Sequence, residues 1–185
     1  MLRQQLVFTA PLDETARHPL SIVREVWDTE EGSQRPYWKY SLPDAVAVAA
    51  FTPDGKIIVV EEFQPGAGES YLHVIGETLE QNEHPLAAAQ RGLREETGFE
   101  ASSHKLLASL TENSGWSNRL IHFVLAENCL DMGRKTEEGI KVKLLTPDKF
   151  WSYLMGRLLT KKPGGAGSLK AATLAFHYLG ILTVR

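Results

Sequence analysis

Two apolar runs that flank a tight turn constrain the fold of this chain most strongly. Residues 44–63 read DAVAVAAFTPDGKIIVVEEF, with Pro53-Asp54-Gly55 between the two runs. Proline pre-sets the backbone of a turn and glycine permits a positive φ angle, so this segment predicts a β-hairpin. The run SYLHVI at residues 70–75 predicts a third strand. These strands are expected to belong to one main domain.

The rest of the chain alternates predicted strands with predicted helices. Further strands are expected at residues 104–110, 118–126 and 139–145, and helices at residues 85–97, 147–158 and 169–182, the last capped by Ser168. This order indicates a mixed α/β or α+β class.

Residues 1–42 contain short β-prone pieces that are too few to bury a core of their own. We expect them to form a small N-terminal sheet that docks on the main domain or on a second subunit. The expected organisation is therefore a dimerising β segment (1–42) and a main domain (43–185).

The composition narrows the class of protein. The formal net charge of −3 gives no basic field, so nucleic acid is not an expected partner. A single cysteine, Cys129, excludes a disulfide within the chain and fits a cytoplasmic location. The N-terminus lacks a long apolar run, so no signal peptide or membrane span is expected.

The helix expected at residues 85–97 carries the most informative side chains. It begins with Pro85 and stops before Gly98, which are the residue types favoured at the two ends of a helix. We expect its apolar face, formed by Leu86, Ala89 and Leu93, to pack on the core, and its charged residues Arg91, Glu95 and Glu96 to project from the other side.

Glu95 and Glu96 are adjacent carboxylates that repel each other, and their presence side by side has two interpretations. A bound divalent cation would relieve the repulsion, since Mg²⁺ takes carboxylate oxygens readily. Alternatively, this is a solvated helix end with an ion pair between Arg91 and Glu95, four residues apart.

The spacing of these residues resembles the signature of the Nudix hydrolases, G-x5-E-x7-R-E-U-x-E-E-x-G-U, in which U is a bulky apolar residue. Seven of its nine defined positions match in register: Glu83, Arg91, Leu93, Glu95, Glu96, Gly98 and Phe99. The two departures are Glu77, where the pattern has its first glycine, and Gly92, where it has the glutamate after arginine. Residues 40–180 are also similar to proteins of the ADP-ribose pyrophosphatase type.

This resemblance implies a fold, an activity and an assembly. The family fold is an α/β/α sandwich around a mixed sheet. The implied activity is hydrolysis, with Mg²⁺ or Mn²⁺, of the diphosphate linkage in a nucleoside diphosphate derivative such as ADP-ribose or a nucleotide sugar. Many members of this subgroup are homodimers that share their N-terminal strands.

The resemblance also implies roles for particular residues. Glu95, Glu96 and the backbone carbonyl near Gly76 would hold the metal, and an ion pair between Arg91 and Glu83 would support the loop. The general base would come from a later loop. Glu137 and Glu138 are the candidates there, and an exposed acidic turn is the alternative interpretation.

Two further residues are candidates for substrate binding. Arg119 can contact phosphate or lie on the surface. Trp38, with Trp27 and Tyr40 nearby in the sequence, can stack on a nucleobase or pack at a domain or dimer contact.

Gly92 raises a question about activity. The family places a metal-binding glutamate at this position, and glycine costs a helix roughly 1 kcal/mol relative to alanine. Either the constraint has relaxed or Gly92 leaves room for something. The alternative function is therefore a catalytically impaired, nucleotide-binding module of the same fold, and a third is a purely structural dimeric protein.

Overall fold

The computed structural model describes residues 3–8, 21–162 and 165–182 of the chain. The chain divides into two compact units. The smaller consists of Met1–Asp44 and Leu110–Ile121, and the larger of Ala45–Ser109 and His122–Arg185. The sequence analysis had assigned residues 110–121 to the main domain.

The smaller unit contains a three-stranded antiparallel sheet in the order β1-β2-β3. Its strands are β1 (Arg3–Phe8), β2 (Ser21–Asp28) and β3 (Gln34–Ser41). After this sheet, Asp44 accepts a 2.8 Å hydrogen bond from the backbone N–H of Leu120 in the same unit.

The larger unit is built on a seven-stranded sheet in the order β12-β5-β4-β10-β9, in which β6 also pairs with β5 and β7 with β4. The strands are β4 (Ala45–Phe51), β5 (Ile57–Gln64), β6 (Glu69–His73), β7 (Ile75–Thr78), β9 (Ser103–Thr111), β10 (Leu120–Glu127) and β12 (Lys141–Leu145). The short strands β8 (Phe99–Glu100) and β11 (Leu130–Asp131) form a separate pair.

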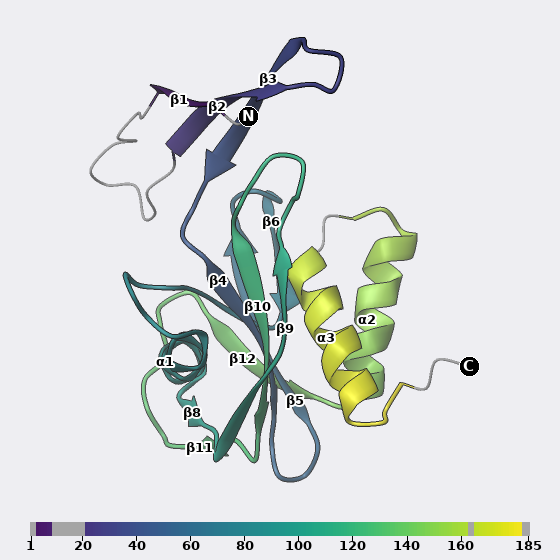
Figure 1. The fold of residues 1–185 in the computed structure, drawn as a ribbon. Coiled ribbons are helices and arrows are strands. Elements are labelled where there is room, and N and C mark those ends of the chain that lie inside the picture. The colour runs from purple at the N-terminus through teal and green to yellow at the C-terminus, as the bar shows by residue number, and fades with distance from the viewer. Residues whose placement is uncertain (1–2, 9–20, 163–164, 183–185) are drawn as a thin grey trace. The chain divides into compact units, whose positions relative to one another are not determined.

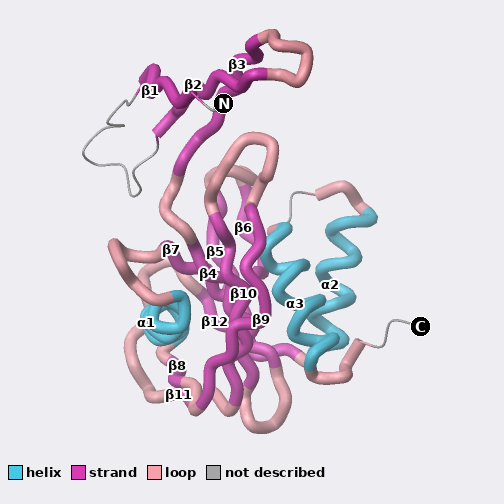
Figure 2. The backbone as a smooth tube through the Cα atoms, in the orientation of Figure 1, coloured by secondary structure: helices cyan, strands magenta, loops and turns pink. Residues whose placement is uncertain are grey.

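Helices cover both faces of this sheet. Figure 1 shows α1 (Pro85–Thr97) on one face and α2 (Pro147–Leu159) with α3 (Ala166–Tyr178) on the other. The tube in Figure 2 shows the same three layers, with the strands between the helices. The expected sandwich of helices around a sheet is confirmed.

The predicted hairpin is the centre of the core. Strands β4 and β5 are antiparallel, with Ala50 opposite Ile58, and Gly55 in the turn has a φ of 77°. Every residue of β4 is buried, and so are the first four residues of β5. Because these strands are buried on both faces, they read as continuous apolar runs rather than as an alternating pattern.

The strand expected at residues 70–75 is divided at Val74. Residues before it pair with β5 and residues after it pair with β4. The backbone N–H of Val74 therefore lies outside both ladders, and it donates instead to the hydroxyl of Ser168 over 3.1 Å. Ser168 was expected to cap the last helix. This prediction was wrong, because the helix begins at Ala166 and the buried hydroxyl of Ser168 faces Val74.

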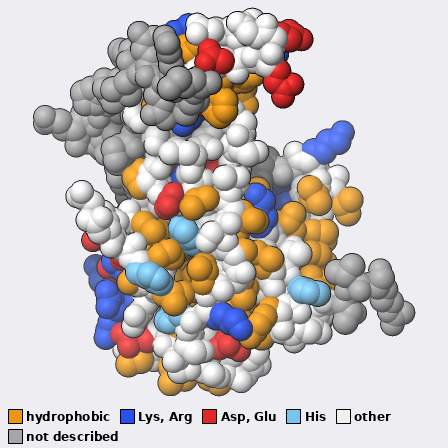
Figure 3. Space-filling model, in the orientation of Figure 1, with side chains coloured by type: hydrophobic (Ala, Val, Ile, Leu, Met, Phe, Trp, Pro, Cys, Tyr) orange, Lys and Arg blue, Asp and Glu red, His pale blue; other side chains and the backbone are white. Residues whose placement is uncertain are grey.

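Two properties of the described residues bear on partners. None of their helices has the length and apolar character that a membrane span needs. On the face drawn in Figure 3, their Lys and Arg side chains are scattered among apolar and acidic ones rather than gathered into one basic surface.

Candidate functional site

Helix α1 begins and ends where the sequence predicted. His84 precedes it, and its ring Nδ1 accepts a 3.3 Å hydrogen bond from the backbone N–H of Leu86. Gly98 follows it with a φ of 75°, and its N–H closes the last turn on the carbonyl of Arg94. These two ends fix where each side chain of the helix lies on the sheet.

The buried face of α1 contains a carboxylate. Ala89 and Leu93 are buried as expected, and Leu86 packs against the same core cluster. Glu96 was expected on the opposite side, and this prediction was wrong: Glu96 is only 7% exposed. Position 96 lies one turn after Gly92 and three residues after Leu93, so it shares their buried face.

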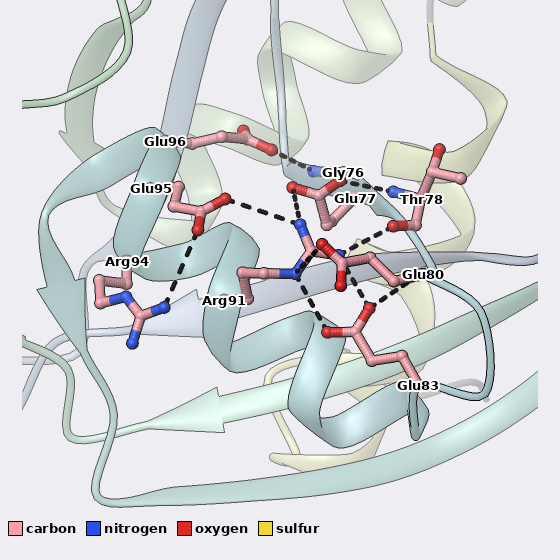
Figure 4. Close-up of polar contacts among 9 residues, drawn as sticks. All are labelled: Gly76, Glu77, Thr78, Glu80, Glu83, Arg91, Arg94, Glu95 and Glu96. Carbon is pink, nitrogen blue, oxygen red and sulfur yellow. Dashed lines mark hydrogen bonds and ion pairs between the residues drawn. The ribbon is translucent and has the colours of Figure 1, made fainter. Parts of the chain in front are cut away.

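Arg91 is the centre of the charged network in Figure 4. Its Nε donates to Glu83 Oε1 over 3.0 Å and its Nη2 donates to Glu83 Oε2 over 2.8 Å. The same Nη2 donates to the carbonyl of Thr78 over 2.9 Å. The ion pair that the resemblance implied is therefore present. It ties the loop before α1 to the helix and lowers the pKa of Glu83 through its hydrogen bonds with Arg91.

Two of the other carboxylates near Arg91 approach its Nη1 atom. Glu77 Oε2 lies 3.1 Å from Arg91 Nη1, and Glu95 Oε2 lies 3.6 Å from the same nitrogen. The Glu95 side chain is 41% exposed and also lies 3.8 Å from Arg94 Nη2. The helical ion pair of the alternative interpretation is therefore present as well, beside the Glu83 pair.

Glu96 is the most unusual group of the site. Its Oε1 accepts a 3.3 Å hydrogen bond from the backbone N–H of Gly76 on β7. Its Oε2 is buried and has no hydrogen-bond partner among the described residues. Burial, followed by the charge of Glu77 and then those of Glu62 and Glu137, raises the pKa of Glu96 to about 9, although the bond from Gly76 opposes this.

A buried acceptor surrounded by carboxylates fits a divalent cation. An orphaned carboxylate oxygen is costly to bury, and a cation would both partner it and offset the repulsion from its neighbours. In the described part of the chain, no three His, Cys, Asp or Glu side chains are arranged so that they could hold a metal ion together. In Figure 4, Glu77 and Glu95 direct carboxylate oxygens at Arg91.

The two candidates for a general base differ in their relation to this site. Both lie in the loop between β11 and β12, and both are exposed. The backbone N–H of Glu137 donates to the carbonyl of Glu95 over 3.2 Å, and the charge of Glu137 reaches Glu96. Glu138 is the next residue along the same turn. Glu137 is therefore the one whose proximity to Glu96 the structure documents.

The two candidate substrate-binding residues belong to the smaller unit. Trp38 is 47% exposed and lines a hollow of about 660 Å³ together with Trp27, Tyr37 and Trp116. Arg119 Nη1 lies 3.5 Å from Glu112 Oε1. Their roles in binding stay predictions.

Comparison with known proteins decides the family. The sequence model of the NUDIX domain matches residues 41–162, which include all the residues of the network around Arg91.

This chain belongs to the Nudix family.

Two curated relatives are similar to parts of this Nudix chain. A methanol dehydrogenase activator from Bacillus methanolicus is 31% identical over 116 residues, which are 60% of this chain and 63% of the relative. An ADP-ribose pyrophosphatase from Bacillus subtilis (strain 168) is 34% identical over 95 residues, which are 51% of each chain. The matches thus span about half to two thirds of these relatives.

A solved structure is similar over almost the whole Nudix chain. It is described as an ADP compounds hydrolase and has a TM-score of 0.74 at 19% identity, covering 96% of this chain and 92% of that one. At this identity the likeness shows the fold, and it confirms the expected α/β/α arrangement around a mixed sheet.

Two carboxylates, those of Glu62 and Glu77, act on Glu96 through their charges but were given no role in the sequence analysis. Of the two, only Glu77 was noted there, as a departure from the pattern. The sequence did contain a signal that Glu77 belongs to this group. Relative to the Nudix pattern, glycine and glutamate are exchanged between positions 77 and 92, so position 77 gains the carboxylate that position 92 lacks.

Proposed function

We propose that this Nudix chain is a hydrolase that cleaves the diphosphate linkage of a nucleoside diphosphate derivative, such as ADP-ribose or a nucleotide sugar, with Mg²⁺ or Mn²⁺. The observation that supports this most is the buried Glu96 oxygen without a partner, set among further carboxylates. The names of the Bacillus subtilis relative and of the solved structure support the substrate class.

The residues that would hold the cation are Glu96, Glu95 and the carbonyl of Gly76. The N–H of Gly76 points at Glu96. In an extended strand, the N–H and C=O of one residue point to the same side, so the carbonyl of Gly76 is expected to face Glu96 too. A bound divalent cation supplies charge neutralisation for the diphosphate and acidifies water.

The chain's own groups would then orient the substrate and remove a proton. Water attacks one phosphorus, the bridging P–O bond breaks, and two phosphate monoesters leave. The proton of the water passes to a carboxylate, for which Glu137 is the better candidate because its charge reaches Glu96. Arg91 and Glu83 would keep the loop and the helix in register.

The smaller unit would contribute to substrate binding and assembly. Trp38 offers an exposed aromatic face for a nucleobase, and Arg119 a cation for phosphate. We also propose a homodimer that includes residues 1–42. Light scattering that finds a monomer of the full chain at micromolar concentration would contradict this assembly.

The test of the function is a screen of nucleoside diphosphate derivatives with Mg²⁺ and with Mn²⁺. Release of phosphate monoesters is followed by coupling to a phosphatase, for the wild type and for Glu96→Gln. Metal-dependent hydrolysis that is lost in the variant supports the proposal. Binding of such compounds without any hydrolysis would contradict it and favour the catalytically impaired binding module.

A further inference from the structure

We propose that Glu77 supplies a carboxylate to the cation site around Glu96, and that Gly92 is glycine because the Glu77 side chain occupies the space beside it. This inference rests on the proposed function, since it adds a residue to the same site. It assigns a role to a side chain that lies outside the matching positions of the Nudix box.

The first observation is steric. A Cβ atom built on Gly92 would lie 2.8 Å from Glu77 Cβ, 3.3 Å from Glu77 Cγ and 3.5 Å from Ile75 Cγ2. Contacts below 3.0 Å do not occur between packed carbons, and the nearest atom is the base of the Glu77 side chain rather than its flexible end. A side chain at position 92 and the present position of Glu77 therefore exclude each other.

The second observation is where the Glu77 carboxylate lies. Strand β7 holds Glu77 directly after Gly76, whose N–H donates to Glu96 Oε1. Glu77 Oε1 accepts a 2.8 Å bond from the N–H of Thr78, and Oε2 faces Arg91. Figure 4 shows the carboxylate of Glu77 between those of Glu96 and Glu83. Among the neighbouring charges that raise the pKa of Glu96, that of Glu77 has the largest effect.

The third observation is the unpartnered oxygen of Glu96. Glu96 Oε2 is buried, and no donor of the described residues satisfies it. An orphaned carboxylate oxygen is costly to bury, and a divalent cation beside it would supply the partner that it lacks. The Glu77 side chain begins in the space that Gly92 leaves open, and in the proposed site its carboxylate takes the part of the one that position 92 lacks.

An alternative role for Glu77 is purely structural, as a partner of Arg91. The chain offers a second, more weakly paired carboxylate beside Arg91 as a control for this possibility. Glu80 Oε1 also lies near Arg91, at 4.0 Å from Nε, and its side chain is exposed. Glu80→Gln removes a carboxylate near Arg91 without changing the surroundings of Gly92 or Glu96.

The experiment measures Mn²⁺ affinity, by the electron paramagnetic resonance signal of free Mn²⁺, and the melting temperature in EDTA. The proteins are the wild type, Glu77→Gln, Glu80→Gln, Glu96→Gln, Gly92→Glu, and the exchange variant that combines Glu77→Gly with Gly92→Glu. Glu77→Gln keeps the shape of the side chain, so its folding is expected to be normal and its affinity is interpretable.

We expect Glu77→Gln to weaken Mn²⁺ binding about tenfold or more, and Glu80→Gln to stay within about twofold of the wild type. Gly92→Glu alone should lower the melting temperature in EDTA by about 5 °C or more, because its Cβ meets Glu77. The exchange variant should regain both the melting temperature and the affinity that Gly92→Glu loses.

Unchanged Mn²⁺ affinity in Glu77→Gln would overturn the inference, and so would an exchange variant that is no better than Gly92→Glu. Glu96→Gln separates this failure from failure of the proposed function. If Glu96→Gln loses Mn²⁺ binding while Glu77→Gln keeps it, only the role of Glu77 is wrong. If neither variant affects binding, the cation site itself is wrong.

Discussion

Glu77 and Gly92 fill one space between strand β7 and helix α1: the Cβ atom that Gly92 lacks would lie 2.8 Å from the Cβ atom of Glu77. These are the two positions at which the chain departs from the Nudix box. The departures are therefore not independent losses. Restoring glutamate at position 92 by itself would create a collision rather than complete the site.

The ion pair between Arg91 and Glu83 should make the protein sensitive to acid. Because Arg91 lowers the pKa of Glu83 in the folded state, this carboxylate stabilises the fold above its ordinary pKa of 4.5. That contribution is lost as the pH falls through the lower, folded value. We expect Glu83→Gln to reduce the free energy of unfolding by about 1–3 kcal/mol at pH 7, and the difference from the wild type to shrink as the pH falls from 5 toward 3.

Urea unfolding at several pH values measures this difference. Glu61→Gln is the control, because Glu61 pairs with Lys143 over 2.7 Å but at a more exposed position on the sheet. Its effect at pH 7 should be much smaller than that of Glu83→Gln. A gap between wild type and Glu83→Gln that stays constant down to pH 3 would contradict this account of the pair.

The hydroxyl of Ser168 should contribute to the stability of the fold. It accepts a hydrogen bond from the backbone N–H of Val74, a residue that lies outside the pairing with both β4 and β5. Ser168→Ala leaves this buried donor without a partner, at a cost of about 1–3 kcal/mol, partly offset by the better helix propensity of alanine. Thermal and urea unfolding measure the loss. Ser102→Ala, at an exposed position, should change stability by less than about 0.5 kcal/mol, and equal effects of the two changes would argue against a role for the Val74 bond.

The two acidic residues of the loop before β12 should differ in catalysis. We expect Glu137→Gln to lower kcat by about 10²-fold or more, because it would remove the proton acceptor. Glu138→Gln should keep a rate close to that of the wild type. Steady-state kinetics on the best substrate of the screen measure both. Similar losses in the two variants, or a loss only in Glu138→Gln, would remove Glu137 as the base.

Much of the fold was predictable because local signals agreed with burial. The turn at Pro53-Asp54-Gly55 and the ends of α1 at Pro85 and Gly98 depend on backbone geometry that few residue types satisfy, and each was found where expected. The division of one predicted strand at Val74 was not predictable, because the donor that it frees is bound by Ser168, ninety-four residues away in the chain.

The sequence predicted which residues belong to the candidate site better than it predicted how their side chains are placed. The resemblance to the Nudix box implied the ion pair between Glu83 and Arg91, which the structure contains. The helical pattern predicted that Glu96 lies on the side away from the core, because a glutamate is normally exposed. Glu96 is instead buried, as is Gly92. The placement of Glu77 depends on contact between a strand and a helix, which the sequence shows only as an exchange of residue types.

The central claim is that the buried Glu96 holds a divalent cation, and calorimetric titration of Mn²⁺ into the full chain tests it most directly. Glu100→Gln serves as the control, because Glu100 pairs with Arg134 over 2.9 Å, outside the carboxylate cluster. We predict saturable binding to the wild type and to Glu100→Gln, and an affinity at least about tenfold weaker in Glu96→Gln. Mn²⁺ binding that is equally strong in Glu96→Gln, or absent from the wild type, would contradict the account.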